Sequence, residues 1–154
     1  MTSTNKQENS QPFWKTKKLE ELSQDQWESL CDRCAKCCLI KLEFEDTAEL
    51  CYTHLVCRYY DEQGCSCTCY DERKVLVPTC VKLTPQNLEA VHYMPVTCAY
   101  RLLFEGKNLP WWHPLVSGTP ESVHGAGISI RGKVLCEDHV KAEDWEEHIV
   151  DWVG

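Results

Sequence analysis

The feature that most constrains this chain is the run Cys31-Asp-Arg-Cys34-Ala-Lys-Cys37-Cys38, which places four thiols in one short segment. Two residues between cysteines allow both sulfurs to reach one ion, and zinc knuckles and iron–sulfur loops use that spacing. Adjacent Cys37 and Cys38 point about 100° apart on a helix and to opposite faces of a strand, so one tetrahedral ion can hardly take both without strain. The doubled cysteine therefore indicates two metals or a bridging thiolate.

Composition limits the compartment and the partners. The 154 residues are 43% hydrophobic and include 12 cysteines, a density that approaches a disulfide scaffold. The N-terminal residues are polar and contain no apolar stretch of signal-peptide length, so we expect a cytoplasmic protein with reduced thiols. No run reaches the length of a membrane-spanning helix, which indicates no membrane partner. The net charge of −8 disfavours non-specific nucleic-acid binding.

The patterning predicts an α+β fold, a small single domain with short helices and hairpins organised around a cysteine-bound metal centre. We expect residues 1–11 to be a disordered lead and residues 12–154 to form the single metal-binding domain. Ser23-Gln-Asp-Gln26 has the pattern of a capping box that starts a helix. If that helix continues through Cys38, the four sulfurs of the run span an arc of about 120°.

Four further segments have clear signals. Residues 39–60 are expected to form a hairpin with Cys57 on its second strand, and we interpret Cys51 and His54 there as bystanders. In an extended segment, Cys65, Cys67 and Cys69 would share one face. Short helices are predicted at residues 86–92, after Thr84-Pro85, and from Pro95 to Gly106, with Cys98 near the N-terminus of the second helix.

The C-terminal third contains few cysteines and several aromatic residues. We interpret Trp111 and Trp112 as packing residues rather than as a ligand platform. A small hairpin is predicted around Gly132. A terminal helix over 141–152 would place Trp145, Ile149 and Trp152 on one face.

The cysteine run resembles the signature of the CxxCxxCC family of proposed zinc- or iron-chelating domains, and other segments resemble its YcgN-type branch. These segments are, in chain order, Trp27–Cys31, Cys80–Thr84, Met94–Leu103, Glu105–Pro110, Trp112–Leu115 and His124–Ser129. The resemblance covers roughly residues 12–152 and implies a zinc or iron ion, or an iron–sulfur cluster, as the cofactor.

Position by position, the resemblance implies nine cluster cysteines: Cys31, Cys34, Cys37, Cys38, Cys57, Cys65, Cys67, Cys80 and Cys98. It leaves Cys51, Cys69 and Cys136 outside the metal centre. Many family members have glycine after the second cysteine of the run, where this chain has Ala35. We therefore do not expect the loop to depend on a positive φ or to turn sharply at that residue.

Three function classes follow. The first is a cytoplasmic protein that binds zinc, iron or an iron–sulfur cluster through thiolates, and the sequence leaves the metal open. The alternative is a metal-dependent or iron–sulfur enzyme with an unidentified substrate, in which His113, His124 or Asp138 handles protons. A thiol oxidoreductase would need an isolated Cys-x-x-Cys, and here too many thiols compete. No nucleotide loop, zinc-protease motif or serine elbow supports the enzyme class.

Overall fold

A three-stranded sheet lies at the centre of the computed structural model, which describes residues 11–153. β1 (Leu39–Glu43) and β2 (Leu50–Val56) pair antiparallel, which confirms the predicted hairpin, but Cys57 lies just after β2 and not on it as predicted. β5 (Leu135–Cys136) pairs parallel to β2. The hairpin predicted around Gly132 is therefore wrong, because the strand after this glycine pairs with β2 and not with the segment before it. β3 (Tyr60–Asp61) and β4 (Ser66–Cys67) form a second, two-stranded sheet.

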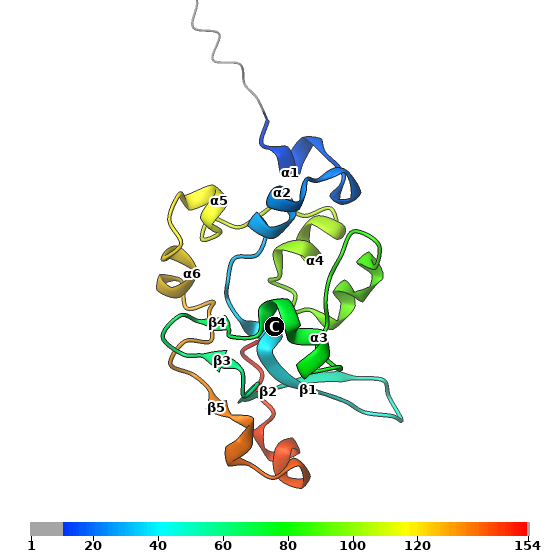
Figure 1. The fold of residues 1–154 in the computed structure, drawn as a ribbon, viewed down its shortest axis with the longest axis vertical. Coiled ribbons are helices and arrows are strands. Elements are labelled where there is room, and N and C mark those ends of the chain that lie inside the picture. The colour runs from blue at the N-terminus through cyan, green and yellow to red at the C-terminus, as the bar shows by residue number, and fades with distance from the viewer. Residues whose placement is uncertain (1–10, 154) are drawn as a thin grey trace, which may run out of the picture.

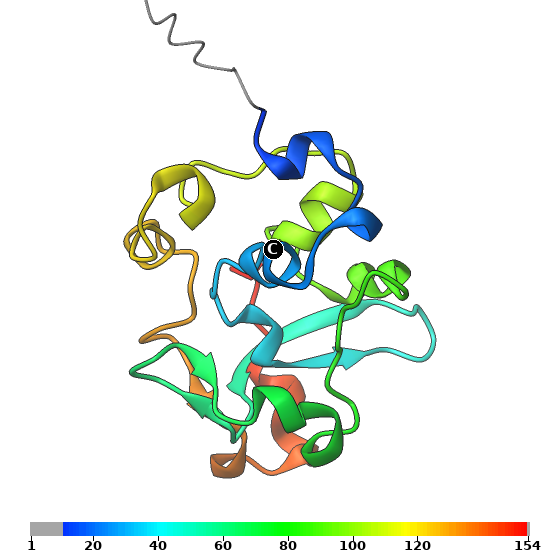
Figure 2. The same ribbon diagram turned by 45° about the horizontal axis from the view of Figure 1, so that its top comes forward.

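Short helices pack at both ends of this sheet. The α-helices are α1 (Phe13–Thr16), α2 (Gln24–Ser29), α3 (Arg73–Leu76), α4 (Ala99–Phe104), α5 (Pro114–Ser117) and α6 (Ser122–Gly125). The 3₁₀ helices are η1 (Leu19–Glu21), η2 (Lys36–Cys38), η3 (Tyr70–Glu72), η4 (Leu88–Tyr93), η5 (Glu137–His139) and η6 (Ala142–His148). Both ribbon views show α1, α2 and α4 at one end of the molecule and the C-terminal 3₁₀ segments at the other (Figures 1 and 2). The short helices and small sheets confirm the α+β class.

The predicted capping box starts α2. Ser23 Oγ accepts a hydrogen bond of 3.2 Å from the Gln26 backbone N–H, and Gln26 Oε1 accepts one of 3.0 Å from the Ser23 N–H. The helix ends at Ser29, however, and residues 31–35 form a loop. The prediction that one helix carries all four sulfurs of the cysteine run is therefore wrong.

Three other helix predictions are confirmed only in part. Cys98 is the N-cap of α4, and Gly106 follows that helix with a φ of 77°. Residues 88–93 and the C-terminal segment form 3₁₀ helices instead of α-helices. After η6 the chain becomes extended, since Val150 N–H donates to Tyr52 O at 2.9 Å and Ile149 bridges Thr53 of β2. Pairing with the sheet therefore ends the terminal helix early.

Two groups of buried side chains form the core. One joins β1 and β2 to the C-terminal segment and contains Ala35, Leu39, Tyr52, Val56, Cys65, Ile130 and Val153. The other joins α2, η4 and α4 and contains Trp27, Leu30, Leu88, Val91 and Tyr100. The cysteine run begins directly after Leu30 and ends directly before Leu39. Both ends of the run are therefore anchored in buried structure.

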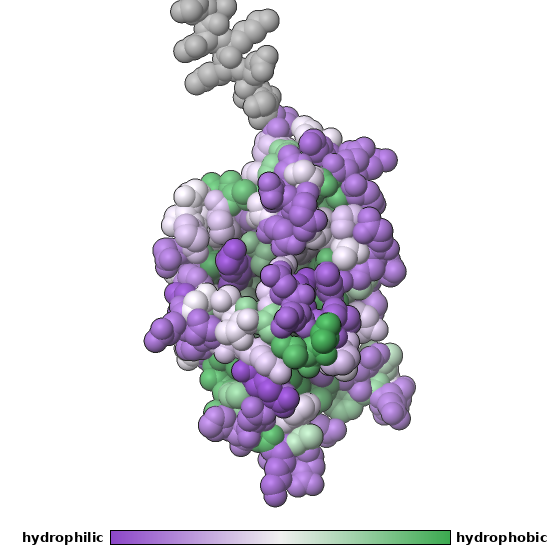
Figure 3. Space-filling model, viewed as in Figure 1, coloured by the Kyte–Doolittle hydropathy of each residue, from purple (hydrophilic) through white to green (hydrophobic). Residues whose placement is uncertain are grey.

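The surface is largely hydrophilic in the view of Figure 3, with a hydrophobic patch where α3 lies. Val75 and Leu76 of that helix are exposed. Trp112 is buried as predicted, but Trp111 is 69% exposed, so the prediction that both tryptophans pack is wrong for Trp111. None of the helices within residues 11–153 has the length and apolar character needed to cross a bilayer. The lead predicted for residues 1–11 falls almost wholly on residues 1–10, outside the described part of the chain.

Candidate metal centre

The loop between α2 and η2 turns sharply at two left-handed residues. Arg33 has a φ of 62° and Ala35 a φ of 60°, a conformation that costs a non-glycine residue about 1 kcal/mol. Asp32 Oδ1 accepts a hydrogen bond of 3.0 Å from the Cys34 N–H, and the Cys38 N–H donates to Ala35 O at 2.9 Å. These contacts, with the burial of Ala35, hold the turn. The expectation that Ala35 excludes a positive φ is therefore wrong.

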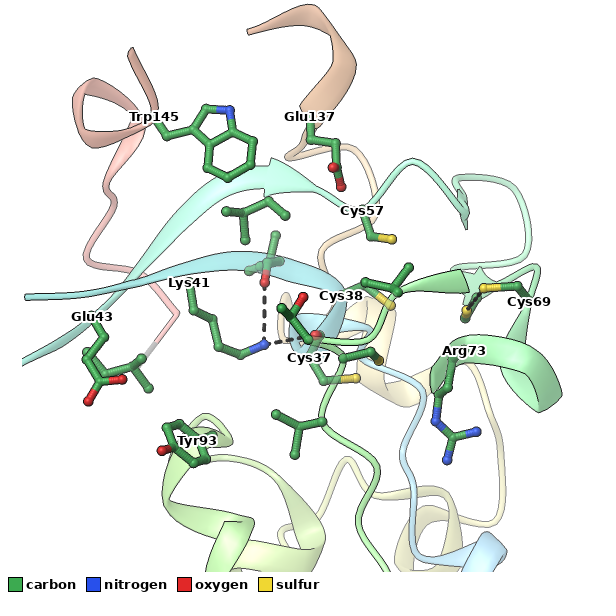
Figure 4. Close-up of a pocket in the computed structure, with 18 residues that line it drawn as sticks. Cys37, Cys38, Lys41, Glu43, Cys57, Cys69, Arg73, Tyr93, Glu137 and Trp145 are labelled. Atoms are coloured by element: carbon green, nitrogen blue, oxygen red, sulfur yellow. Dashed lines mark hydrogen bonds between the residues drawn. The ribbon is translucent and has the colours of Figure 1, made fainter. Parts of the chain in front are cut away.

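The turns direct the thiols of the run into two adjoining cavities. We call them the small cavity, of about 120 Å³, and the large cavity, of about 540 Å³. Cys31, Cys34 and Cys98 line only the small cavity, and Cys57 and Cys69 line only the large one. The shared thiols, which line both cavities, are Cys37, Cys38, Cys67 and Cys80. Figure 4 shows the thiols gathered at one end of the large cavity, opposite Glu43 and Tyr93.

Burial keeps most of these thiols protonated while no cation is bound. Loss of hydration, with the Cys37 charge second, raises the pKa of Cys31 to about 12. Cys31 is reached by solvent, yet the cavity walls surround its sulfur closely enough to strip hydration. Burial also raises the pKa of Cys98 to about 12 and raises the pKa values of Cys34 and Cys57. A bound cation would reverse this balance and release protons.

The adjacent thiols Cys37 and Cys38 shift each other's pKa in opposite directions. The Cys38 thiol hydrogen-bonds to the Cys37 sulfur and lowers the pKa of Cys37 to about 6, with the Lys41 ammonium contributing less. The same hydrogen bond raises the pKa of Cys38. Lys41 Nζ is held near Cys37 by the Cys37 carbonyl at 3.0 Å and the Leu39 carbonyl at 3.4 Å. Within the pair, Cys37 is therefore the thiol that ionises more easily.

Backbone N–H groups face several of the sulfurs. Each of Cys31, Cys34 and Cys57 receives a hydrogen bond from the backbone of the residue two positions later. Cys98, at the start of α4, receives hydrogen bonds from the Tyr100 and Arg101 backbones. Each contact lowers the pKa of its thiol, because a backbone donor stabilises the thiolate. These donors therefore offset part of the rise in pKa that burial causes.

Cys69, which was predicted to lie outside the metal centre, is adjacent to Cys67. The two sulfurs are 3.6 Å apart. Two thiolates on one tetrahedral zinc ion, each with a Zn–S bond of about 2.3 Å, lie roughly 3.8 Å apart. Burial, together with the hydrogen bond to Cys67, raises the pKa of Cys69 to about 11. The pair therefore has the spacing of two ligands of one ion.

Cys65 lies in the core and lines neither cavity. It is 1% exposed, packs in the group that contains Ala35, and its thiol donates to the Cys34 carbonyl at 3.9 Å. The prediction that Cys65, Cys67 and Cys69 share a face is wrong, because β4 contains only Ser66 and Cys67 and Cys65 has a φ of 48°. Strand alternation does not apply to so short a strand.

The remaining cysteines lie apart from the thiol group. Neither Cys51, beside Glu49, nor Cys136, opposite Val56, lines the small or the large cavity. Among residues 11–153 no three Cys, His, Asp or Glu side chains already converge on one coordination point. Thiol side chains rotate between staggered positions at small cost, and the donors are the soft thiolates that zinc and iron prefer. The donor chemistry therefore fits a metal ion after rotation of the side chains.

The residues considered for proton transfer have structural contacts. His113 is 1% exposed, and its Nδ1 accepts from Leu115 N–H at 3.0 Å, so the other ring nitrogen donates to Leu30 O at 2.7 Å. His124 Nδ1 lies 2.7 Å from Ser129 Oγ, and Asp138 pairs with Arg58 at 3.0 Å. None of the three lines either cavity.

Comparisons with known proteins place the chain in a family. The family model named CxxCxxCC, described as "Putative zinc- or iron-chelating domain", matches residues 30–99. A UPF0260 protein of Parvibaculum lavamentivorans is 57% identical over 142 residues, which cover 92% of this chain and 93% of the relative. The chain belongs to the CxxCxxCC family. The predicted membership is thereby confirmed.

Further UPF0260 relatives match over nearly their whole length. A UPF0260 protein of Marinobacter nauticus is 55% identical, with 92% of this chain and 96% of the relative covered. One of Sinorhizobium fredii is 52% identical, with 92% and 91% covered. No solved structure matches the chain. The matched residues 30–99 include all nine cysteines that line the two cavities.

Proposed function

We propose that this protein binds zinc or iron through a thiolate centre built in the two adjoining cavities, in the cytoplasm, where thiols stay reduced. The observation that carries the proposal is that nine thiols line these two adjoining cavities, four of them shared. The family description of a zinc- or iron-chelating domain supports the same chemistry. The roles that suit it are a structural centre, a metal store or a delivery site.

The proposed ligands differ in one position from those that the family resemblance implies. We assign Cys31, Cys34, Cys37, Cys38, Cys57, Cys67, Cys69, Cys80 and Cys98, so that Cys69 replaces Cys65. One tetrahedral ion takes four ligands, and nine thiolates are therefore enough for more than one ion. The shared thiols lie where a bridging thiolate would have to lie.

An iron–sulfur cluster is the second candidate, and the backbone donors are compatible with it. N–H groups that hydrogen-bond to the Cys31, Cys34 and Cys57 sulfurs are among the features that tune cluster potentials. The same donors also stabilise thiolates on zinc. The enzyme alternative has less support, because the proposed proton-handling residues lie outside the cavities.

The test is the metal content of protein purified under anaerobic, reducing conditions. We expect more than one zinc or iron per chain by elemental analysis, and substitution of a shared thiol, Cys37→Ser or Cys80→Ser, to lower that number. Cys136→Ser, a thiol outside both cavities, is the matched control and should leave it unchanged. Visible charge-transfer absorption would indicate an iron–sulfur cluster. A reduced, folded protein that stays metal-free after loading with either ion would overturn the proposal.

A further inference from the structure

The large cavity has more volume than a metal ion bound to its lining residues would occupy. It encloses about 540 Å³, against about 120 Å³ for the small cavity. Sites for small organic ligands occupy roughly 300–1,000 Å³. A chelator or another small ligand therefore fits into the large cavity beside an ion, whereas the small cavity has no such room.

A carboxylate accompanies the thiols of the large cavity. Glu137 follows β5 directly, and because Cys136 pairs with Val56 of β2, the carboxylate lies next to Cys57. Its charge, after burial, raises the pKa of Cys57. Figure 4 shows the Glu137 carboxylate above the Cys57 thiol, and its side chain is only 13% exposed. The thiol end of this cavity thus offers oxygen as well as sulfur donors.

Arg58 holds this carboxylate in place. Arg58 Nη2 lies 3.1 Å from Glu137 Oε1, and the Arg58 backbone N–H donates to Oε2 at 3.2 Å. A carboxylate has about four lone-pair sites, so about two stay free for a cation. Carboxylates that bind metals are commonly oriented by such outer contacts. Glu43, the other carboxylate of the cavity, is exposed and forms no side-chain hydrogen bond or ion pair within residues 11–153.

We propose that the large cavity is a distinct, exchangeable metal position, in which a zinc or ferrous ion binds Cys57 and the Glu137 carboxylate. Shared thiolates and water complete the coordination. The inference rests on the proposed function, since it divides the same thiolate centre into two unequal positions. An incoming ligand has room to attack this ion, whereas an ion surrounded by thiolates in the small cavity has no open coordination position. The ion in the large cavity therefore exchanges faster.

The test measures metal release from the zinc-loaded full chain under anaerobic, reducing conditions. Metal per chain is counted first, and a chromogenic chelator then records release over time. We expect two phases, a fast one from the large cavity and a slow one from the small cavity. Glu137→Gln should lower the fast amplitude at least twofold and keep the slow phase. Cys57→Ser should remove about one metal per chain together with the fast phase, and Cys34→Ser should reduce the slow phase instead.

Glu43→Gln is the matched control, because it neutralises the other carboxylate of the same cavity without touching the proposed ligands. It should release metal as the unaltered protein does. A single release phase in the unaltered protein, or an undiminished fast phase in Glu137→Gln, would overturn the inference while leaving the thiolate centre intact. Absence of bound metal in the unaltered protein would instead overturn the proposed function. If Cys57→Ser fails to fold, Glu137→Gln decides the matter, since it preserves the shape of the side chain.

Discussion

Cysteines close together in this chain lie either in the core or beside a cavity. Cys65 and Cys69 lie on either side of Cys67, yet Cys65 points into the core and Cys69 lies 3.6 Å from the Cys67 sulfur. A buried thiol behaves as a small apolar residue, whereas a thiol in a cavity among others is positioned to bind a cation. The same residue type therefore lies in opposite surroundings four positions apart.

This contrast predicts different effects for the two substitutions. Cys69→Ser should lower the metal content, because an alcohol is a poor ligand for soft ions. Cys65→Ser should keep the metal but lower the free energy of unfolding by about 1–3 kcal/mol, since a hydroxyl is buried among apolar side chains. Elemental analysis and thermal melting of both variants check this. Metal loss in Cys65→Ser with retention in Cys69→Ser would reverse the assignment and favour the set implied by family resemblance.

Lys36 supplies a buried positive charge beside the thiols. It is 3% exposed, and its ammonium donates to Thr97 Oγ1 and to Val153 O, both at 3.1 Å. Within residues 11–153 it forms no ion pair with a carboxylate. Burial lowers its pKa, and the charges of Cys34, when ionised, and Asp32 oppose that shift. In the proposed thiolate centre, the Lys36 charge would compensate part of the negative charge of the thiolates.

Lys36→Met should weaken metal binding by about tenfold. This is the lower end of the loss in affinity that follows when residues supporting metal ligands are substituted. The metal-free protein should melt at a similar or higher temperature, because a buried charge without a carboxylate partner stabilises little. Competition titration against a chelator of known affinity gives the binding constant. Lys107→Met, on the surface, is the control. Equal weakening in both variants would rule out a specific role for Lys36.

At the scale of elements, the loop 31–38 connects two separately packed groups of side chains. It leaves α2 next to Leu30 and enters β1 at Leu39, and each end is buried in a different part of the core. Its left-handed residues bring sulfurs from one short segment to both cavities. The geometry of this loop therefore links metal binding to the packing of the whole fold.

The left-handed position of Ala35 predicts a graded response to substitution. Ala35→Gly should keep the metal and change stability by no more than about 1 kcal/mol, because glycine adopts this φ without strain. Ala35→Val should cost more than about 2 kcal/mol and reduce metal binding, since a β-branched residue is strained there and overfills a buried site. Melting and metal counts are the measurements.

Ala48 offers the matched control, because it also has a positive φ, of 55°, but lies exposed in the β1–β2 turn. Ala48→Val should destabilise the protein without loss of metal. If Ala35→Val retained all its metal, the loop conformation would not determine the site.

At the scale of the molecule, the metal should stabilise the fold, because its proposed ligands lie in segments far apart in the chain. They come from the loop 31–38, from the chain after β2, from β3–β4, from the chain after α3 and from the start of α4. Binding to the folded state alone contributes about 4 kcal/mol when free metal is 1,000 times the dissociation constant. Removal of the metal should then lower the melting temperature by roughly 10 °C and increase proteolysis within residues 31–80. Calorimetry and limited proteolysis check this. An unchanged melt in verified metal-free protein would contradict it.

The metal-free protein should also lose stability in alkali. An unfolded cysteine ionises with a pKa of about 8.5, whereas burial holds the pKa of Cys98 at about 12 and raises that of Cys34. Above pH 8.5 the unfolded chain binds fewer protons than the folded one, so the free energy of unfolding falls, by up to about 1 kcal/mol per thiol and pH unit. Cys37 has a lowered pKa and adds no such loss above that pH.

Melting curves between pH 7.5 and 9.5, under anaerobic reducing conditions, test this dependence. The metal-loaded protein is the control, and its melting temperature should vary less, because its thiolates are already ionised in the folded state. A metal-free melting temperature that stays constant or rises over this range would show that the thiols are less buried than the structure indicates.

The sequence by itself determined the class of chemistry, since four thiols spaced by two residues and then doubled suit few tasks besides metal binding. It also determined the local motifs formed by residues close together in the chain: the capping box at Ser23, the β1–β2 hairpin and the end of α4 before Gly106. Tertiary structure decided which thiols meet. Periodicity describes regular helices and strands, whereas Cys65 and Ala35 adopt left-handed angles that depend on distant packing, and Glu137 reaches Cys57 only because β5 pairs with β2. Such placements arise from contacts between segments far apart in the chain, and local spacing does not encode them.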